Sequence, residues 1–582
     1  MDAGEDWQSA AVARFSSWLV LPVRIDAGAA GASPAEWIGK LTRTADPSPR
    51  RGKRRTIPLW TRLQTLKTFK KPFRGRIDTF GDELRSVLGL SETSTPDRRP
   101  TQWYQLDPEL LGSCNPALAF GGTAGRTYRR ICFQRCVLAL AAGGIGVLGI
   151  RWRPVEEQEG GVGELGDVLE CMDGLRHYRG ERDDQGRFRG LVFHPSPEEA
   201  PASELVPVSI ARWCESLFRE CADDGAREGE PAPAGCLRLL DSVRYAKQHA
   251  CAVLESPLGA AATERVAAHL ARGFGVAYGG SGGTAVSLGV RTHDHSGRCL
   301  AISQDGVACV SDLASRDEFE ADQWASVFAG VYFVIHALVE LQARTLSELA
   351  ARSRAAAESL SHRSEEAVRA AEAVLQEREA SRTLCGPRIH FTLAEYRTYH
   401  GRLREAYEIE PLSRSLDAAM AQLSEDVESS RDLGKVFLVH GHDHGVLHDV
   451  ARFLEHLLGR DNIVVLGEKT HEGRSIIEKF EAHSRVGFAV VLLTPDDRGG
   501  PQGEPPRSLR PRARQNVVFE LGYFLGAIGR DRVCALHTGD VEIPSNYSGV
   551  ALHEYDPRGA WKLELARELK AKGFDVDLGG LL

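Results

Sequence analysis

One acidic residue, Glu520, stands in an otherwise apolar helical stretch near the C-terminus. At about 100° per residue, the apolar residues around it form one buried stripe, and Glu520 lies on the flank of that stripe beside Asn516 and Tyr523. The stripe consists of Val517, Val518, Leu521, Phe524, Leu525 and Ile528. A carboxylate at such a border can face a pocket and stabilise positive charge on a reacting centre. The structural alternative is a solvated glutamate paired with Arg512 or Arg514.

The elements that must hold Glu520 alternate between strand and helix signals from residue 435 to about 577. Short apolar runs predict strands at 435–440, 462–466, 487–494 and 532–537, and amphipathic stretches predict helices at 446–458, 475–484 and around Glu520. A Gly/Pro-rich loop, 499–511, precedes the last of these helices. This alternation predicts βαβ units and an open parallel sheet, whose ligands bind beyond the carboxyl ends of the strands.

Five motifs occur in order along this segment: VFLVHGHD at 436–443, EGRSIIEKFE at 472–481, FAVVLLTPDD at 488–497, RARQNVVFELGYF at 512–524 and IPSNYSGV at 543–550. With these motifs the segment resembles the bacterial TIR-like domain of nucleotide-signal-activated antiphage effectors. The resemblance implies a flavodoxin-like fold and cleavage of NAD+ to nicotinamide and an ADP-ribose product. Glu520 matches the family's glutamate on the third helix, whereas Asn546 stands where an acidic residue is expected.

The implied reaction needs one carboxylate. Nicotinamide leaves a cationic donor as a neutral base, so the second carboxylic acid of ordinary glycoside hydrolysis is unnecessary. What remains is to stabilise an oxocarbenium-like ribosyl centre, which a preorganised anion does. We expect Glu520 to lie close to the start of its helix, where the helix dipole favours the ionised form. NAD+ is then the substrate, and no cofactor is required.

Several residues at the predicted strand ends and helix starts are candidates for binding this substrate. Arg514 and Asn516 would orient Glu520 or hold ribose and phosphate. The helix start at 473–475 offers backbone N–H groups to a pyrophosphate, with Arg474 as its charge partner. The full set of binding candidates is His440, Gly441, Asp443, Gly473, Arg474, Ser475, Thr494, Asp496, Asp497, Arg514 and Asn516.

Two other patterns do not carry the chemistry that they suggest. His440, His442, His444 and His448 crowd together, but no Cys or Glu ligand follows at a typical spacing, so we expect no metal. The run Gly144–Gly149 matches G-x-G-x-x-G, yet Arg151-Trp-Arg-Pro154 follows where a dinucleotide-binding helix should begin. We interpret that run as part of a buried Gly-rich strand.

Composition narrows the class of protein. The chain has 582 residues, which suit two to four domains, and its net charge of −8 gives no general nucleic-acid signature. Eleven Lys or Arg residues between Arg50 and Arg76 are interleaved with aromatic residues, and a basic loop over 46–76 is favoured there over nucleic-acid binding. The cysteines are scattered, which predicts reduced thiols. The sequence shows no long uncharged apolar segment and no basic leader, so we expect a cytoplasmic protein without membrane contact.

The N-terminal part is expected to be a mixed α/β domain at 1–322, with strands near 17–25, 136–152 and 190–193. A long helix follows from residue 324 to about 383, apolar first and charged later, and Gly386-Pro387 ends it. Such a helix suits a stalk that bundles with other copies through Val331, Ile335 and Leu338. A mixed α/β domain followed by a long helix loosely resembles the cytoplasmic part of CorA-like magnesium channels, without their membrane helices. An unrelated sensor domain joined to a helical spacer is the alternative.

The resulting hypothesis has three parts: a sensor and oligomerisation domain at 1–322, a long helix and helical linker at 323–434, and a TIR-like domain at 435–582. The function implied is an NAD+ glycohydrolase of antiphage defence that assembly into a homo-oligomer activates. The activating signal would be a nucleotide second messenger or a phage component. The alternatives are a non-catalytic TIR signalling module and an N-glycosidase acting on other nucleotides.

Overall fold

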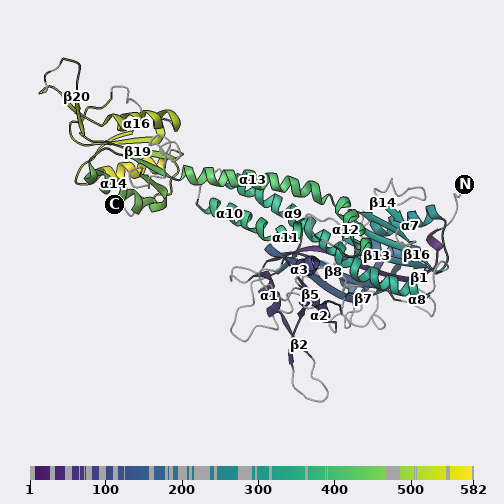
Figure 1. Cartoon of the computed structure of the whole chain (residues 1–582). Helices are drawn as coiled ribbons and strands as arrows, with labels where there is room; N and C mark the ends of the chain where they lie inside the picture. Colours follow the sequence, from purple (N-terminus) through teal and green to yellow (C-terminus); the bar gives the residue numbers. More distant parts are fainter. Residues whose placement is uncertain are drawn as a thin grey trace. The chain divides into compact units, whose positions relative to one another are not determined.

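The computed structural model divides into two compact units, residues 1–350 with 376–416 and residues 351–375 with 417–582. The units are called the first and the second unit below (Figure 1). The structure describes residues 7–579 except 27–32, 46–54, 65, 71–72, 74–81, 89, 91–99, 109–115, 123–124, 156–162, 177–180, 183–187, 194–205, 209–212, 215–235, 241–245, 273–290, 295–297, 314–317, 361–364, 387–388, 390, 466–484, 504, 506 and 545–550.

The first unit is built on a 14-stranded mixed sheet, as predicted for the N-terminal part. Its main path runs β11 (Val206–Val208), β10 (Phe188–Phe193), β6 (Pro116–Gly122), β7 (Gly125–Ala141), β8 (Ile145–Pro154), β1 (Val12–Asp26), β13 (Lys247–Leu254), β16 (Gly306–Asp312), β15 (Cys299–Ser303) and β14 (Arg291–Asp294). Along this path β13 and β16 pair in parallel and the other neighbours pair antiparallel. The Gly-rich run at 144–149 lies almost wholly in β8, a buried strand as predicted.

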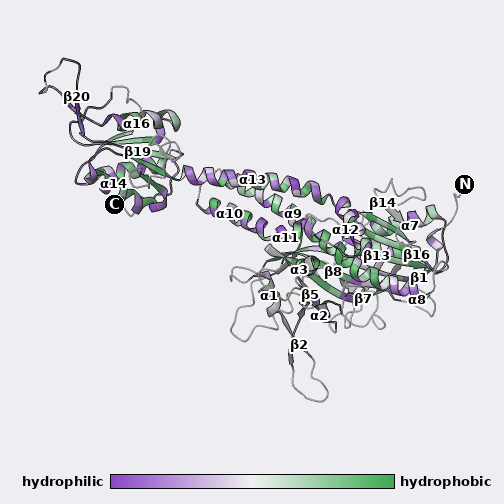
Figure 2. Cartoon of the chain, viewed as in Figure 1, coloured by the Kyte–Doolittle hydropathy of each residue, from purple (hydrophilic) through white to green (hydrophobic). Residues whose placement is uncertain are grey.

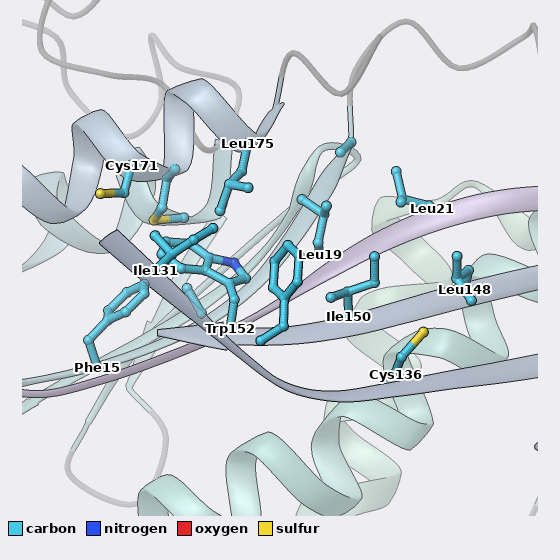
Figure 3. Packing of buried hydrophobic residues seen from close by; sticks show 14 of the residues in the cluster. Phe15, Leu19, Leu21, Ile131, Cys136, Leu148, Ile150, Trp152, Cys171 and Leu175 are labelled. Carbon is cyan, nitrogen blue, oxygen red and sulfur yellow. The ribbon is translucent and has the colours of Figure 1, made fainter. Parts of the chain in front are cut away.

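Side chains alternate between the two faces of this sheet, and a different layer of helices covers each face. Leu19 and Trp152 pack with helices α5 (Leu165–Arg176) and α7 (Ala260–Arg272), and the ring of Phe15 packs at a tilt against that of Trp152 with ring centroids 5.3 Å apart (Figure 3). Trp18 points to the opposite face, where its ring lies 3.9 Å from that of Phe333. This period-two alternation along β1 buries both faces of the strand.

The predicted long helix exists but is interrupted and has another role. It runs as α8 (Glu318–Val327), a π-helical turn (Phe328–Tyr332) and α9 (Phe333–Leu360). Val331, Ile335 and Leu338 are fully buried within this one chain, so the prediction that they bundle copies of the protein was wrong. The helix is long and apolar enough to cross a membrane, yet 78% of its most apolar window is buried against the fold. A sequence pattern defines an apolar face but does not identify what covers it.

A buried hydrogen-bond chain joins this helix to β13 and to the end of α12 (Ala394–Ala406). The Phe328 carbonyl can only accept, so His249 donates to it through Nε2 at 2.9 Å and must accept at Nδ1. His336 Nδ1 lies 3.2 Å from His249 Nδ1, and His336 Nε2 lies 2.8 Å from the Tyr407 hydroxyl, which also forms a hydrogen bond with Glu340. Burial lowers the pKa of His249 to about 3. Burial also lowers the pKa of His336, so both imidazoles are neutral at neutral pH.

The stretch predicted as a basic loop, 46–76, has regular structure where the chain is described. Strand β3 (Arg55–Pro58) pairs with β2 (Thr42–Ala45), and β4 (Trp60–Arg62) and α2 (Leu66–Lys70) follow. Trp60, Phe69 and Phe73 are buried, and Phe73 packs edge-on against Trp103 at 5.7 Å. The aromatic side chains therefore belong to the core, and they are not available to stack on bases.

After α9, the chain continues through α10 (Glu365–Ala380), α11 (Arg382–Cys385), α12 and α13 (Ile409–Leu433). Helix α11 ends at Gly386, where the sequence predicted a break. Helix α13 alternates polar and apolar residues (Figure 2) and leads within two residues into the first strand of the second unit. There the Leu433 carbonyl lies so close to Gly487 that a Cβ atom at that position would approach it to 1.7 Å. Glycine is therefore required beside the end of α13.

The second unit contains the parallel sheet that the sequence predicted. Its order is β18 (Ile463–Val465), β17 (Val436–Val439), β19 (Phe488–Leu493), β22 (Val533–His537) and β23 (Ala551–Glu554), with every pair parallel. In sequence order this is 2-1-3-4-5, the flavodoxin-like arrangement. Helices α14 (His444–Leu458) and α17 (Ala560–Ala571) pack on one face, and α16 (Gln515–Ala527) packs on the other.

Among the described residues, nine cysteines form no disulfide. Cys251 and Cys309 pair in register on the neighbouring strands β13 and β16 and are not joined. Burial raises the pKa of the Cys251 thiol well above its usual value and that of Cys309 to about 12. Thiols of this kind are unreactive as long as the surrounding structure stays closed.

Candidate functional site

Glu520 lies on α16 with its side chain partly buried. The residues facing the sheet are Val517, Leu521 and Phe524, and Glu520 is on the flank of this face, as the periodicity predicted. Val518, which was also predicted to be buried, is exposed. No hydrogen bond or ion pair holds Glu520 among the described residues, so pairing with Arg512 or Arg514 does not account for it. Within the described chain it is a carboxyl group without a partner.

The electrostatics of Glu520 differ from the prediction. Burial raises the pKa of Glu520 to about 7, whereas proximity to the helix start was expected to favour the ionised form. Glu520 is the sixth residue of α16, and the effect of the helix dipole fades within the first turn. Desolvation therefore dominates, and near neutral pH the carboxyl group is close to half protonated.

Two loops meet at the carboxyl ends of β17 and β19, where the site was predicted. The backbone N–H of His442 donates to Asp496 Oδ2 at 3.2 Å, and the Thr494 hydroxyl donates to the same oxygen at 2.9 Å. Gly441 leaves no room for a side chain, because a Cβ atom there would lie 1.8 Å from Asp496 Oδ2. His440 Nδ1 donates to the Gly441 carbonyl at 2.9 Å. Asp496 therefore links the loop after β17 to the loop after β19 by hydrogen bonds.

The start of α16 joins the same cluster through Arg514. Its Nη1 contacts His442 Nε2, and because a guanidinium can only donate, His442 accepts at Nε2 and carries its proton on Nδ1. His442 was not among the predicted binding residues, although its place between Gly441 and Asp443 at a strand end was a usable signal. Asn516, one turn before Glu520, is exposed.

Two predicted binding residues have evident structural roles. Asp443 is the N-cap of α14, and its Oδ1 accepts from the backbone N–H groups of Gly445 at 3.0 Å and Val446 at 3.1 Å. Asp497 begins β20 (Asp497–Gly499), which pairs with β21 (Arg510–Arg512) across the predicted Gly/Pro-rich loop. Gly473, Arg474, Ser475 and the helix predicted at 475–484 lie outside the described residues. Among the described residues, the structure thus brings together the predicted binding segments 440–443, 494–497 and 514–516.

This arrangement combines a partly buried, unpartnered carboxyl group with a rim of hydrogen-bonding and cationic groups at the carboxyl edge of a parallel sheet. Arg514 and the loop N–H groups can hold an anionic ligand, and the Glu520 carboxylate can stabilise a cation. Such a combination suits a ligand that carries both charges.

Comparison with known proteins agrees with the fold. Residues 435–557 match the family model described as CAP12/Pycsar effector protein, TIR domain. An uncharacterized protein, YuaY, from Escherichia coli (strain K12) is 49% identical over 144 residues, which are 25% of this chain and 47% of that protein. Protein tirC from Dictyostelium discoideum is 34% identical over 130 residues, which are 21% of this chain and 64% of that protein. The chain thus spans about half of the first relative and less than two thirds of the second.

Proposed function

We propose, from the premise that residues 435–557 form a TIR domain of the CAP12/Pycsar effector family, that this chain is an NAD+ glycohydrolase of antiphage defence. One observation carries the proposal: Glu520 is a partly buried carboxyl group whose pKa burial raises to about 7, and no described residue pairs with it. A protein core does not retain such a group for stability, because a charge without a partner is costly to bury. A perturbed carboxyl group in this place is a candidate for catalysis.

The proposed reaction breaks the bond between the ribose C1′ and the nicotinamide nitrogen. The bonding electrons go to the nicotinamide ring, which leaves as a neutral base, and a water oxygen then bonds to C1′ and releases one proton to solvent. Between these events C1′ carries positive charge, which the Glu520 carboxylate stabilises. The nicotinamide cation of the bound substrate also favours the ionised form of Glu520, since an opposite charge within about 4–6 Å lowers a carboxyl pKa.

We infer that the first unit receives an activating nucleotide signal and that assembly of several chains accompanies activation. The reason is control, since an unrestrained NAD+ hydrolase would deplete its own cell. The buried apolar face of α8 and α9 is not available for this assembly, so other surfaces must serve. Cysteines that form no disulfide within the described chain suit a reducing compartment, and we propose that the protein acts in the cytoplasm.

The test is NAD+ cleavage by the purified full-length chain, alone and with a panel of 3′,5′-cyclic mononucleotides, followed by chromatography of nicotinamide and ADP-ribose. Glu520→Gln should lower the rate by about a hundredfold or more, equivalent to roughly 3 kcal/mol of lost transition-state stabilisation. Glu564→Gln, which removes a half-buried carboxylate of α17, is the control and should retain the rate. Full cleavage by a folded Glu520→Gln protein would contradict the mechanism.

A further inference from the structure

Helices α12 and α13 meet at an elbow of two residues, Tyr407 and Glu408. Glu408 has a φ of 52°, in the left-handed region, and it is the one non-glycine residue of the described chain with a positive φ. A residue with a Cβ atom adopts this region at a cost in free energy, and glutamate lacks the short polar side chain that offsets the cost in asparagine. Such a residue persists only where the surrounding structure holds it, and it is found at switch regions.

The Tyr407 side chain holds the elbow in the core of the first unit. Tyr407 is buried, and its hydroxyl hydrogen-bonds with the Glu340 carboxylate and lies 2.8 Å from His336 Nε2. A carboxylate can only accept, so the hydroxyl donates to Glu340. The Lys247 ammonium lies 4.0 Å from the centre of the tyrosine ring. Strand β13 and helix α9 thus both hold the residue that precedes the strained Glu408.

Glu340 is the charged centre of this arrangement. It is fully buried, and its two oxygens form ion pairs with Lys247 at 2.6 Å and with Arg344 at 2.7 Å. Burial alone would raise the pKa of Glu340, but the two cations lower it to about 2, so the carboxyl group is ionised at neutral pH. Buried ion pairs add little net stability, because desolvation offsets the attraction, but they require one geometry. What the cluster provides is a single position for the Tyr407 hydroxyl.

A second set of contacts spans the elbow from the helix before it to the helix after it. Arg404 lies buried in the last turn of α12, and its Nε donates at 2.9 Å to Oε1 of Glu410 in the first turn of α13. Its Nη1 donates to Gln342 Oε1 of α9 at 3.2 Å. One guanidinium thus bridges three helices around the elbow.

Helix α13 leads from this elbow into the second unit. It runs for 25 residues without a break, and residues 409–416 are part of the first unit, whereas residues 417–433 are part of the second. Strand β17 of the parallel sheet then begins at Val436. A change of backbone conformation at Glu408 therefore acts on a helix that belongs to both units.

We infer that the elbow at Tyr407 and Glu408 is a latch by which the first unit controls the second. The inference rests on the proposed function, in which a signal received by the first unit releases the reaction at Glu520. In the latched conformation, Tyr407 and Arg404 hold Glu408 in the left-handed region. Loss of their contacts lets Glu408 return to an unstrained backbone, and α13 then leaves the elbow in another direction.

The direction of control follows from which state must dominate. The idle state has to be the more populated one before a signal arrives, and the conformation in which the buried contacts of Tyr407 are formed is the more stable one. The latched elbow is therefore the idle state, and its release is the activating step.

The activity test removes the latch contacts in the full-length chain, without any added nucleotide. Tyr407→Phe deletes the hydroxyl and keeps the ring, and it should raise the rate of NAD+ cleavage about tenfold, the effect of one buried hydrogen bond on the balance of two states. Glu408→Gly removes the strain of the latched backbone, so it should not raise the rate and should lower the raised rate when combined with Tyr407→Phe.

Tyr104→Phe is the matched control, because it removes a buried hydroxyl that donates to Gln102 elsewhere in the first unit, and it should leave the rate unchanged. A folded Tyr407→Phe protein that cleaves NAD+ no faster than an active wild type would overturn the latch.

Hydrogen–deuterium exchange separates the latch from the reaction. In Tyr407→Phe, the amides of residues 405–416 and 417–433 should exchange about tenfold faster than in the wild type and in Tyr104→Phe, whereas Glu408→Gly should slow them. If no variant cleaves NAD+ but exchange follows this pattern, the latch stands and the proposed reaction fails. Exchange that rises in neither segment, or only in residues 405–416, would reject the latch.

A second variant keeps both tests decisive if Tyr407→Phe does not fold. Glu410→Gln breaks the bridge from Arg404 at an exposed position, and it should change the NAD+ cleavage rate and the exchange in the same direction as Tyr407→Phe.

Discussion

At the scale of single residues, the sequence predicted which carboxyl group to examine but not its protonation. The periodicity of residues 517–528 placed Glu520 on the flank of a helix, and the structure agrees. Burial raises the pKa of Glu520 to about 7. How far the folded protein covers this carboxyl group depends on tertiary packing, which a local pattern of residue types does not predict.

Titration of Glu520 should appear in stability and in activity over neighbouring pH ranges. A raised carboxyl pKa means that the folded state resists ionisation, so stability falls as pH rises from about 4.5 to about 7 and is constant above. Glu520→Gln removes this loss of stability and should melt at a higher temperature than the wild type at pH 8 but not at pH 4.

The wild-type kcat/KM should fall about tenfold per pH unit below pH 7, since the ionised form of Glu520 is required. Parallel calorimetry and rate profiles check both, and equal melting temperatures at pH 8 would contradict the burial of this charge.

At the scale of elements, the second unit was the more predictable part. Strands β17, β19 and β22 are continuous apolar runs, and their alternation with helices predicted a parallel sheet. The hairpin of β20 and β21 was missed, because strands of three residues in a Gly/Pro-rich segment carry no periodic signal. In the first unit, the strand order could not be predicted, since antiparallel pairing between distant segments leaves little trace in local sequence.

The role of Asp443 is tested at this scale. As the N-cap of α14 it satisfies two backbone N–H groups, so Asp443→Ala should lower the free energy of unfolding of the second unit by about 1 kcal/mol. Asp443→Asn keeps a capping oxygen and should be nearly neutral. Urea unfolding followed by circular dichroism measures both. A stable Asp443→Ala protein with weakened NAD+ binding would assign Asp443 to the ligand instead of the helix.

At the scale of the whole molecule, the first unit contains a group of buried histidines that makes it sensitive to acid. Burial lowers the pKa of His249 and His400 to about 3, and it also lowers the pKa values of His269 and His336. Because the unfolded chain binds protons below about pH 6.5 and the folded unit does not, stability is lost as pH falls below that value.

The free energy of unfolding of the first unit should fall by up to about 1.4 kcal/mol per histidine for each pH unit below 6.5. His400→Leu removes one titrating group whose Nε2 has no partner and should reduce the pH dependence by one proton. His456→Gln, at an exposed position of α14, is the control and should leave it unchanged. Urea titrations at pH 7.5, 6.5 and 5.5, followed by tryptophan fluorescence, provide the measurement. A urea midpoint that does not change with pH would contradict the assignment of acid sensitivity to these buried histidines.

The buried thiols provide a built-in reporter of local opening. Of the described free cysteines, Cys534 lies in the second unit and the others lie in the first. A maleimide reacts with such a thiol only when the structure around it opens, so mass spectrometry of timed labelling yields a separate opening rate for each unit. Adding a cyclic nucleotide and comparing the labelling of Cys534 with that of Cys309 would reveal which unit tightens or loosens, even in a protein that turns over no substrate.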